Sequence, residues 1–308
     1  GSEPRYEAVL LDARIRKSWL ENNINIARIG GGDKASYNIN ELGDDVKIIE
    51  QIFKGKHSYN KILEKSNKTL FLIGESVLNR EDGSGILGRI RDIAKKYNSY
   101  SDKWNGIGVL HTSANRVGAL EAGFVPGKGG LNTSEIIEGT KNKKIKLLWL
   151  LGYDEEIIEK DSSAFIIYQG HHGDFGAESA DLILPGSAYT EKNGTYINTE
   201  GRVQRTYAAV PAPGNAKEDW KIIRAFSEYI DKTLPYNNIS QLRSHLENIN
   251  KNFVIENSLL KAEMTDIGDI KVKLKNASIK PLKMNYFMTC PISRSSETMA
   301  KCSIAKSK

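Results

Sequence analysis

The sequence predicts an α/β protein with a doubly wound, mostly parallel sheet, followed by an extended C-terminal tail. Strand-like and helix-like segments alternate through the first 250 of the 308 residues. Several strand-like segments are apolar throughout, as expected for strands covered on both faces of a parallel sheet. Clear periodicity is lost after Asn250. We therefore expect an α/β domain over residues 1–250 and a separate tail over residues 251–308.

Five short apolar segments are predicted to be strands, with helices between them. The expected strands are residues 24–29, 70–73, 107–110, 145–151 and 165–168. In two intervening segments apolar residues recur at helical spacing. These are Val46, Ile49 and Phe53 in the first segment and Ile86, Ile90 and Ile93 in the second. This alternation favours a Rossmann-like sheet with helices on both faces.

The rhythm changes after Leu184. Residues 196–203 are predicted to form two short strand pieces around a turn at Glu200 and Gly201, where Gly201 and Asn198 favour a left-handed backbone. Helices are expected from Ala216 to about Ile230 and over residues 239–246. Lysines alternate with apolar residues over positions 271–275, as in an edge strand with blocking charges.

The tail carries the net charge of the protein, which is +6. Residues 251–308 contain 11 Lys and Arg and 5 Asp and Glu. A basic tail can indicate binding to nucleic acid or to an anionic membrane. The lysines are scattered, however, with few aromatic residues among them. We therefore favour a solvated or partner-facing tail and expect no nucleic acid as partner.

Apolar anchors in the tail are separated by polar stretches. They are Phe253, Val254, Ile255, Leu259, Leu260, Tyr286, Phe287 and Met288. Such a segment cannot build its own core, so we expect it to lie on the body of the protein or on a partner. Its lysines would favour an acidic groove. Disorder is the alternative interpretation.

No membrane span is expected, because the longest apolar run, residues 146–152, is far shorter than a bilayer requires. No signal peptide is recognised, and we predict no direct membrane insertion. Gly1 and Ser2 resemble residues left by an expression tag and are set apart from the fold.

The two cysteines, Cys290 and Cys302, both lie in the tail. Cluster and zinc sites need about four thiolate or imidazole ligands at short spacing. His111, His171 and His172 lie far upstream, so no metal site is predicted. Two thiols in this length suit a reducing compartment.

Polar residues follow the expected strand at residues 165–168, where open α/β sheets bind ligands. His171 or His172 could act as a general base oriented by Asp174. The alternative is a loop whose histidines bond to neighbouring backbone, and we favour it because no nucleophile is evident. Similarly, residues 30–32 (Gly-Gly-Gly) could bind phosphate but lack the spaced glycine pattern, which favours a plain turn.

Glu191, Glu200 and Arg202 form another candidate set. Two carboxylates could perform acid–base chemistry. The interpretation that we favour is structural: an arginine close in sequence to the carboxylates holds the turn by a charge-assisted bond.

Residues 184–204 resemble the signature block of the molybdopterin oxidoreductase superfamily. The shared pattern is Leu-Pro, Glu-Lys, Gly-Thr, Asn, Glu-Gly-Arg and Gln, followed by Pro-Gly at 213–214 and the segment 219–223. Residues 4–8 and 13–17 also resemble this family. The resemblance implies a structural signature made of Glu191, Gly194, Asn198, Glu200, Gly201, Arg202 and Trp220.

Residues 168–174 and the terminal segments 287–289, 292–294 and 298–302 are similar to the largest iron–sulfur subunit of respiratory complex I, NADH–quinone oxidoreductase. In mitochondria this is the 75 kDa subunit, and in bacteria it is the G subunit. The resemblance implies a peripheral-arm scaffold region, with 2Fe–2S and 4Fe–4S clusters outside these residues. Its partners would be other peripheral-arm subunits, on the cytoplasmic side of the bacterial inner membrane or on the mitochondrial matrix side.

Two departures distinguish the chain from catalytic members of the superfamily. Catalytic relatives usually place an acidic residue and Thr-Ala before Ala180 and Asp181, where this chain has Phe-Gly-Ala at 175–177. They also continue into a barrel domain that binds the pterin cofactor. In this chain residues 231–308 are basic and aperiodic. We therefore expect no catalytic or cofactor-binding residues in this chain. Proton-translocating activity is expected only of the whole complex. The alternatives are a molybdopterin-dependent oxidoreductase fragment that still binds cofactor and a free-standing dinucleotide-binding enzyme.

Overall fold

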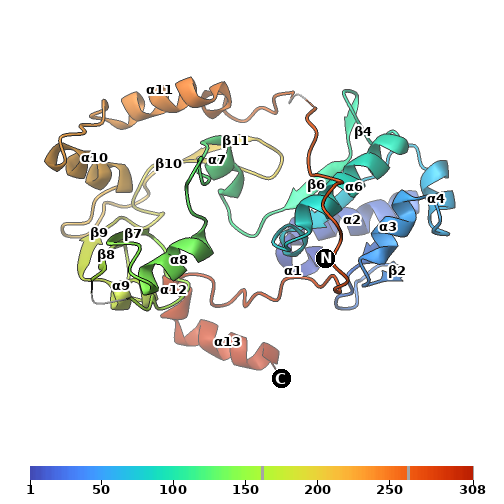
Figure 1. The fold of residues 1–308 in the computed structure, drawn as a ribbon, viewed down its shortest axis with the longest axis horizontal. Coiled ribbons are helices and arrows are strands. Elements are labelled where there is room, and N and C mark those ends of the chain that lie inside the picture. The colour runs from blue at the N-terminus through green and yellow to red at the C-terminus, as the bar shows by residue number, and fades with distance from the viewer. Residues whose placement is uncertain (161–162, 262–263, 308) are drawn as a thin grey trace. The chain divides into compact units, whose positions relative to one another are not determined.

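Short parallel sheets alternate with helices in the computed structural model, joined by long irregular segments (Figure 1). The structure describes residues 1–160, 163–261 and 264–307. Two compact units are formed. Unit 1 contains Gly1–Ala114 and Leu260–Met284, and unit 2 contains Asn115–Leu259 and Asn285–Lys308. The mixed α/β class predicted from the sequence is confirmed.

Unit 1 combines two parallel strand pairs and a short antiparallel pair with α-helices of four to fourteen residues. In order, its elements are α1 (Pro4–Glu7), α2 (Val9–Asn22), β1 (Ala27–Ile29), β2 (Asn40–Gly43), α3 (Lys47–Phe53), α4 (Asn60–Lys65), β3 (Phe71–Gly74), α5 (Glu75–Leu78), α6 (Gly83–Lys96), β4 (Tyr100–Ser101), β5 (Trp104–Asn105) and β6 (Ile107–Leu110).

The core of unit 1 lies between α3, α6 and the parallel pair β3–β6. Ile49 of α3 and Ile86 and Ile93 of α6, which recur at helical spacing in the sequence, are buried, and so is Ile52 of α3. Ile73 of β3 joins the same cluster. Burial of one face of each helix accounts for the periodic apolar pattern.

Residues 264–284, called the strap below, lie on unit 1 without forming a helix or strand. Glycines let the strap approach α6 closely: a Cβ on Gly88 would come within 2.9 Å of the Ile270 nitrogen. Ile279, 1% exposed, fills the core of unit 1, and its amide donates to the Asp44 carbonyl at 2.7 Å. The strap therefore completes a core that residues 1–114 begin.

Arginines at and within α6 satisfy the carbonyls of the strap. Arg80 donates to the Ser278 carbonyl at 3.0 Å, Arg89 to Val272 at 3.1 Å and Arg91 to Ile267 at 3.0 Å. Backbone outside regular structure needs such partners when it is buried. The acidic groove expected for the lysines of the tail stays a prediction; among the strap lysines, Lys275 pairs with Glu81.

Unit 2 contains a three-stranded parallel sheet, a hairpin and helices. In order, its elements are α7 (Arg116–Glu121), α8 (Thr133–Lys141), β7 (Leu147–Leu151), β8 (Phe165–Gly170), α9 (Phe175–Ser179), β9 (Leu182–Pro185), β10 (Gly194–Ile197), β11 (Val203–Thr206), α10 (Asp219–Tyr229), α11 (Ile239–Ile249), the 3-10 helix η1 (Lys251–Val254), α12 (Pro291–Arg294) and α13 (Glu297–Ser307).

The sheet of unit 2 has the order β7-β8-β9, with all strands parallel. Leu150 and Tyr168 are register partners and point into one core, together with Ile166. On the opposite face the Trp149 ring packs edge-on against Phe226 of α10, with centroids 4.8 Å apart. Helices on both faces explain why these strands are apolar throughout.

The hairpin β10–β11 has its own small core. Ile197 and Val203, both 1% exposed, pack with Phe253 of η1. The amide of Asn257 donates to the Val203 carbonyl at 2.8 Å, so the chain from Phe253 to Asn257 runs along the hairpin. The anchor predicted at Phe253 is confirmed, whereas Leu259 and Leu260 are about half exposed.

All five predicted strand regions contain strands, and the predicted helices and hairpin are also present. A single doubly wound sheet is not confirmed. The parallel strands divide among separate sheets of two, two and three strands. The expected division at residue 250 stays a prediction, although the residues after it pack partly with each unit.

Three local expectations are wrong. Residues 271–275 form no strand, because the Lys275 amide donates to the Asp82 carboxylate at 2.7 Å instead of to a strand. The chain end is helical at α13 and not extended. Gly1 and Ser2 belong to the fold: Ser2 is 7% exposed, and the Gly1 nitrogen donates to the Ile29 carbonyl at 2.6 Å.

No helix within residues 1–160, 163–261 and 264–307 is long and apolar enough to cross a bilayer.

Candidate functional site

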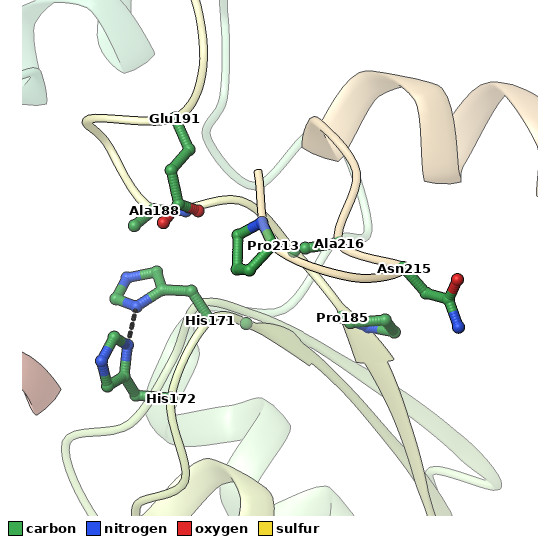
Figure 2. A pocket seen from close by; sticks show the side chains of 10 residues that line it. His171, His172, Pro185, Ala188, Glu191, Pro213, Asn215 and Ala216 are labelled. Carbon is green, nitrogen blue, oxygen red and sulfur yellow. Dashed lines mark hydrogen bonds between the residues drawn. The ribbon is translucent and has the colours of Figure 1, made fainter. Parts of the chain in front are cut away.

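A pocket opens in unit 2 where strands β8 and β9 end. Gly170 and Pro185, the last residues of these strands, lie in its wall. Its volume is about 450 Å³, and the loops that follow the strands complete it (Figure 2). The remaining lining residues are His171, His172, Gly186, Ala188, Glu191, Pro213, Asn215 and Ala216. The pocket thus occupies the ligand-binding position of an open α/β sheet.

The two histidines bind each other. Their Nδ1 atoms are 2.7 Å apart, so one ring donates to the other, as the dashed line in Figure 2 shows. Burial, reinforced by the neighbouring His172 and Lys192, lowers the pKa of His171. Two protonated rings would place two N–H groups against each other, so the pair is stable only when at least one ring is neutral.

Glu191 closes a turn. Its carboxylate accepts from the Ala188 amide at 2.9 Å, and its own amide donates to the Ala188 carbonyl at 2.9 Å. One carboxylate oxygen is thereby engaged in holding the pocket wall. Glu191 and Glu200 belong to different turns, so the two carboxylates do not form one acid–base pair.

Asp174 faces an arginine from the terminal segment. Its carboxylate caps α9 by accepting from the Phe175 amide at 2.9 Å and binds Arg294 Nε at 2.5 Å. Arg294 also reaches the Asp154 carboxylate at 3.1 Å, and we call these contacts the Arg294 clamp. The hydrogen bond from Arg294 holds the pKa of Asp174 below its usual value. Asp174 is thus bound to Arg294 and does not orient a histidine.

The hairpin turn is held mainly by Asn198. Its side-chain oxygen accepts from the amides of Glu200 and Arg202, both at 3.0 Å. Gly201 has φ +86°, as predicted, whereas Asn198 is not left-handed. The Glu200–Arg202 ion pair is 3.6 Å long and largely exposed on the Glu200 side. Arg202 instead donates to the Asn257 carbonyl, which joins the hairpin to the chain beyond residue 250.

A polar network that the sequence did not predict fixes the start of α10. The Lys192 ammonium pairs with the Asp219 carboxylate at 2.5 Å, and the Gln169 amide donates to the same side chain at 2.9 Å. Glu218 accepts from the Trp220 indole at 3.0 Å and from the Asn193 amide at 3.2 Å. Lys192 and Asn193 of the signature block (residues 184–204) therefore bind the two residues before Trp220.

Gly194 begins β10 opposite Thr206. A Cβ at this position would lie 2.8 Å from the Thr206 hydroxyl and from the Tyr196 ring. A larger residue here would have to displace the Thr206 hydroxyl or the Tyr196 ring, so glycine fits this position best.

The donor sets do not fit the metal groups implied by the resemblance. Among the residues that the structure describes, no three His, Cys, Asp or Glu side chains are grouped to hold a metal ion. Cys290 and Cys302 are free thiols. The pocket lining offers a carboxylate and a histidine pair but neither lysine nor arginine, so it does not suit the phosphate of a pterin cofactor.

Sequence similarity identifies the class of protein to which this pocket and hairpin belong. The chain belongs to the molybdopterin oxidoreductase family, since the sequence model described as molybdopterin oxidoreductase matches residues 1–229. A second model, which describes the C-terminal region of the G subunit of NADH-ubiquinone oxidoreductase, matches residues 254–302. The predicted resemblance to both groups is thereby confirmed.

Individual relatives agree with this assignment. The NADH-ubiquinone oxidoreductase 75 kDa subunit of Reclinomonas americana is 44% identical, over 98% of this chain and 44% of its own length. The mitochondrial 78 kDa subunit of Candida albicans is 44% identical, over 98% of this chain and 42% of its own. The G subunit of the Rickettsia conorii NADH-quinone oxidoreductase is 40% identical, over 99% and 44%. The chain thus spans less than half the length of these relatives.

Proposed function

We propose that the chain is a scaffold region of the largest peripheral-arm subunit of NADH–quinone oxidoreductase. Electrons would pass from NADH to quinone through 2Fe–2S and 4Fe–4S clusters outside these residues. Redox and proton-translocating activity would belong to the complex and not to this chain. The names of the relatives and the two family matches support this role.

The observation that carries the proposal is that polar side chains in and around the signature block (residues 184–204) are already engaged within the chain. Asn198 is engaged by backbone amides, Asp219 by Lys192 and Gln169, and Asp174 by Arg294. Catalytic acids and bases need a free face toward a substrate. Asn198 instead holds its own turn, whereas Asp219 and Asp174 join segments far apart in sequence, which is what a scaffold requires.

The alternative is an oxidoreductase fragment that still binds a molybdopterin cofactor. The pocket at the ends of β8 and β9 favours it, because that is where open sheets bind ligands. The carboxylate of Glu191 and the missing cationic side chains in the lining disfavour an anionic cofactor. We therefore propose that no cofactor is bound within these residues.

The proposed partners, location and domain organisation follow from the same assignment. Partners would be other peripheral-arm subunits, without nucleic acid and without direct insertion into the membrane. The location would be the cytoplasmic face of the bacterial inner membrane or the mitochondrial matrix face. In the whole subunit, residues 1–250 would form one doubly wound domain, and residues 251–308 would fasten it.

Two measurements test the proposal. We expect the purified chain to contain neither stoichiometric Mo, W or Fe nor pterin. In the assembled complex, His171→Ala, His172→Ala and Glu191→Gln should leave the NADH–quinone turnover per assembled complex unchanged. Bound metal or pterin, or a complex that assembles normally but loses turnover in these variants, would overturn the scaffold assignment.

A further inference from the structure

Helix α2 uses only one of its faces within unit 1. Its half-buried residues recur at intervals of three and four, as expected for a helix lying on a surface. They are Leu11, Asp12, Ile15, Ser18 and Trp19. Asp12 fixes the helix by accepting from the Tyr37 hydroxyl at 2.7 Å. The opposite face therefore has no role in holding unit 1.

That opposite face combines apolar side chains with cations. Leu10 is 83% exposed, Val9 62% and Leu20 59%. Between them along the helix lie Arg14, Arg16 and Lys17, all exposed. These six residues are called the α2 face below.

The cations of the α2 face have almost no partners within the described chain. Neither Arg14 nor Arg16 makes a hydrogen bond or an ion pair with the residues that the structure describes. Lys17 approaches only Glu21, at 3.8 Å, with 70% of its side chain exposed. This contrasts with Arg80, Arg89 and Arg91, which are all bound to the strap. The positive charge on α2 thus remains available to a molecule outside the chain.

We propose that the α2 face is a docking surface for an acidic segment of another polypeptide. Apolar side chains and arginine are the residues that protein interfaces favour. The three cations require carboxylates opposite them, and Leu10 and Leu20 supply contacts at each end of the helix. The inference rests on the proposed function, because it takes the chain to be part of an assembly.

A polypeptide fits the α2 face better than a membrane or a nucleic acid. Recruitment to anionic lipid typically uses clusters of about 4–8 basic residues, and the α2 face has fewer. Nucleic acid binding combines phosphate contacts with stacking aromatic side chains. The single aromatic residue of α2, Trp19, lies on the half-buried face.

The first test is chemical labelling of the purified assembly that contains the full subunit. Lys17 should lose at least about tenfold in acetylation rate relative to the isolated chain, a change equivalent to about 1.4 kcal/mol of protection. A carbodiimide should join its ammonium to an Asp or Glu of a different polypeptide. Lys61 and Lys65 of α4, which are also exposed, serve as matched controls and should keep their labelling rates.

The second test is charge reversal. Arg14→Glu with Arg16→Glu should reduce incorporation of the chain into the assembly at least about tenfold. Lys61→Glu with Lys65→Glu changes the net charge equally and should leave incorporation unchanged. Both variants should keep the thermal unfolding temperature of the wild-type chain, since neither removes an internal bond.

If Lys17 in the assembly is labelled at the rate of the isolated chain, the inference is overturned and the proposed function still stands. A crosslink within the same polypeptide, or protection by phosphatidylserine–phosphatidylcholine vesicles without any protein, would have the same consequence. If the wild-type chain enters no assembly, the proposed function fails and the inference with it.

Discussion

Replacing Arg294 with alanine would remove the side chain that joins the terminal segment to the strand-end loops of unit 2. Two carboxylates, on Asp154 and Asp174, would lose their cation. Removing one partner of a buried ion pair costs about 3–5 kcal/mol. The three side chains are 9–18% exposed, so solvent reduces the expected cost to about 2–3 kcal/mol.

Thermal unfolding of the Arg294→Ala variant is the direct assay. A loss of about 2–3 kcal/mol lowers the Tm by about 4–10 °C in a unit of this size. Lys301→Ala is the matched control, because it removes one cation from the same segment at an exposed position. Arg294→Lys should fall between the two, since lysine cannot form the same forked contacts. A Tm of Arg294→Ala equal to that of the control would refute the clamp.

The Arg294 clamp also predicts a pH dependence. Arg294 lowers the pKa of Asp174 in the folded chain, below an unfolded value of about 3.9. The stabilisation is therefore complete above about pH 4 and is lost as the pH falls through the lowered folded pKa. In Arg294→Ala the free energy of unfolding should change less over this acidic range. An identical dependence in both proteins would contradict the assignment.

Further predictions concern the hairpin and the strap. Asn198→Ala should cost about 1–3 kcal/mol, because two backbone amides lose their acceptor, whereas Glu200→Ala should cost less than about 1 kcal/mol; urea unfolding measures both. Ile279→Ala should lower the stability of unit 1 by about 2–5 kcal/mol, and the exposed Leu260→Ala by less than about 0.5 kcal/mol. Equal effects within either pair would contradict the described contacts. The Lys275 amide, bound to a buried carboxylate, should exchange hydrogen more slowly than the Leu260 amide.

Local apolar patterns in the sequence predicted the strands and helices well. The continuous apolar run near Leu150 and the spacing of Ile86, Ile90 and Ile93 depend only on which side chains must be buried. The parallel pairing also follows from this. How many strands join one sheet depends on contacts between distant segments, and the sequence of one chain does not contain that information in a readable pattern.

The sequence indicated where in the fold a candidate site would lie, but not which side chains would contact one another there. The loop after residues 165–168 could be expected to reach a pocket, and it does. The partner of Asp174 lies 120 residues further along the chain, at Arg294. Both segments showed the family resemblance, which is the signal available from sequence. Nothing in their spacing indicates that they meet, because such a contact depends on the completed fold.

The strap has a consequence for the order in which the protein matures. Residues 1–114 of unit 1 are synthesised before all of unit 2's main segment, but the strap follows it. The roughly 150 residues between them take about 8–30 s to synthesise at about 5–20 residues per second. During that interval the site that Ile279 fills and the glycine-lined side of α6 are open to water. Unit 1 can therefore finish folding only after residues 115–259 of unit 2 are translated, and premature termination within these residues would leave unit 1 with an exposed core.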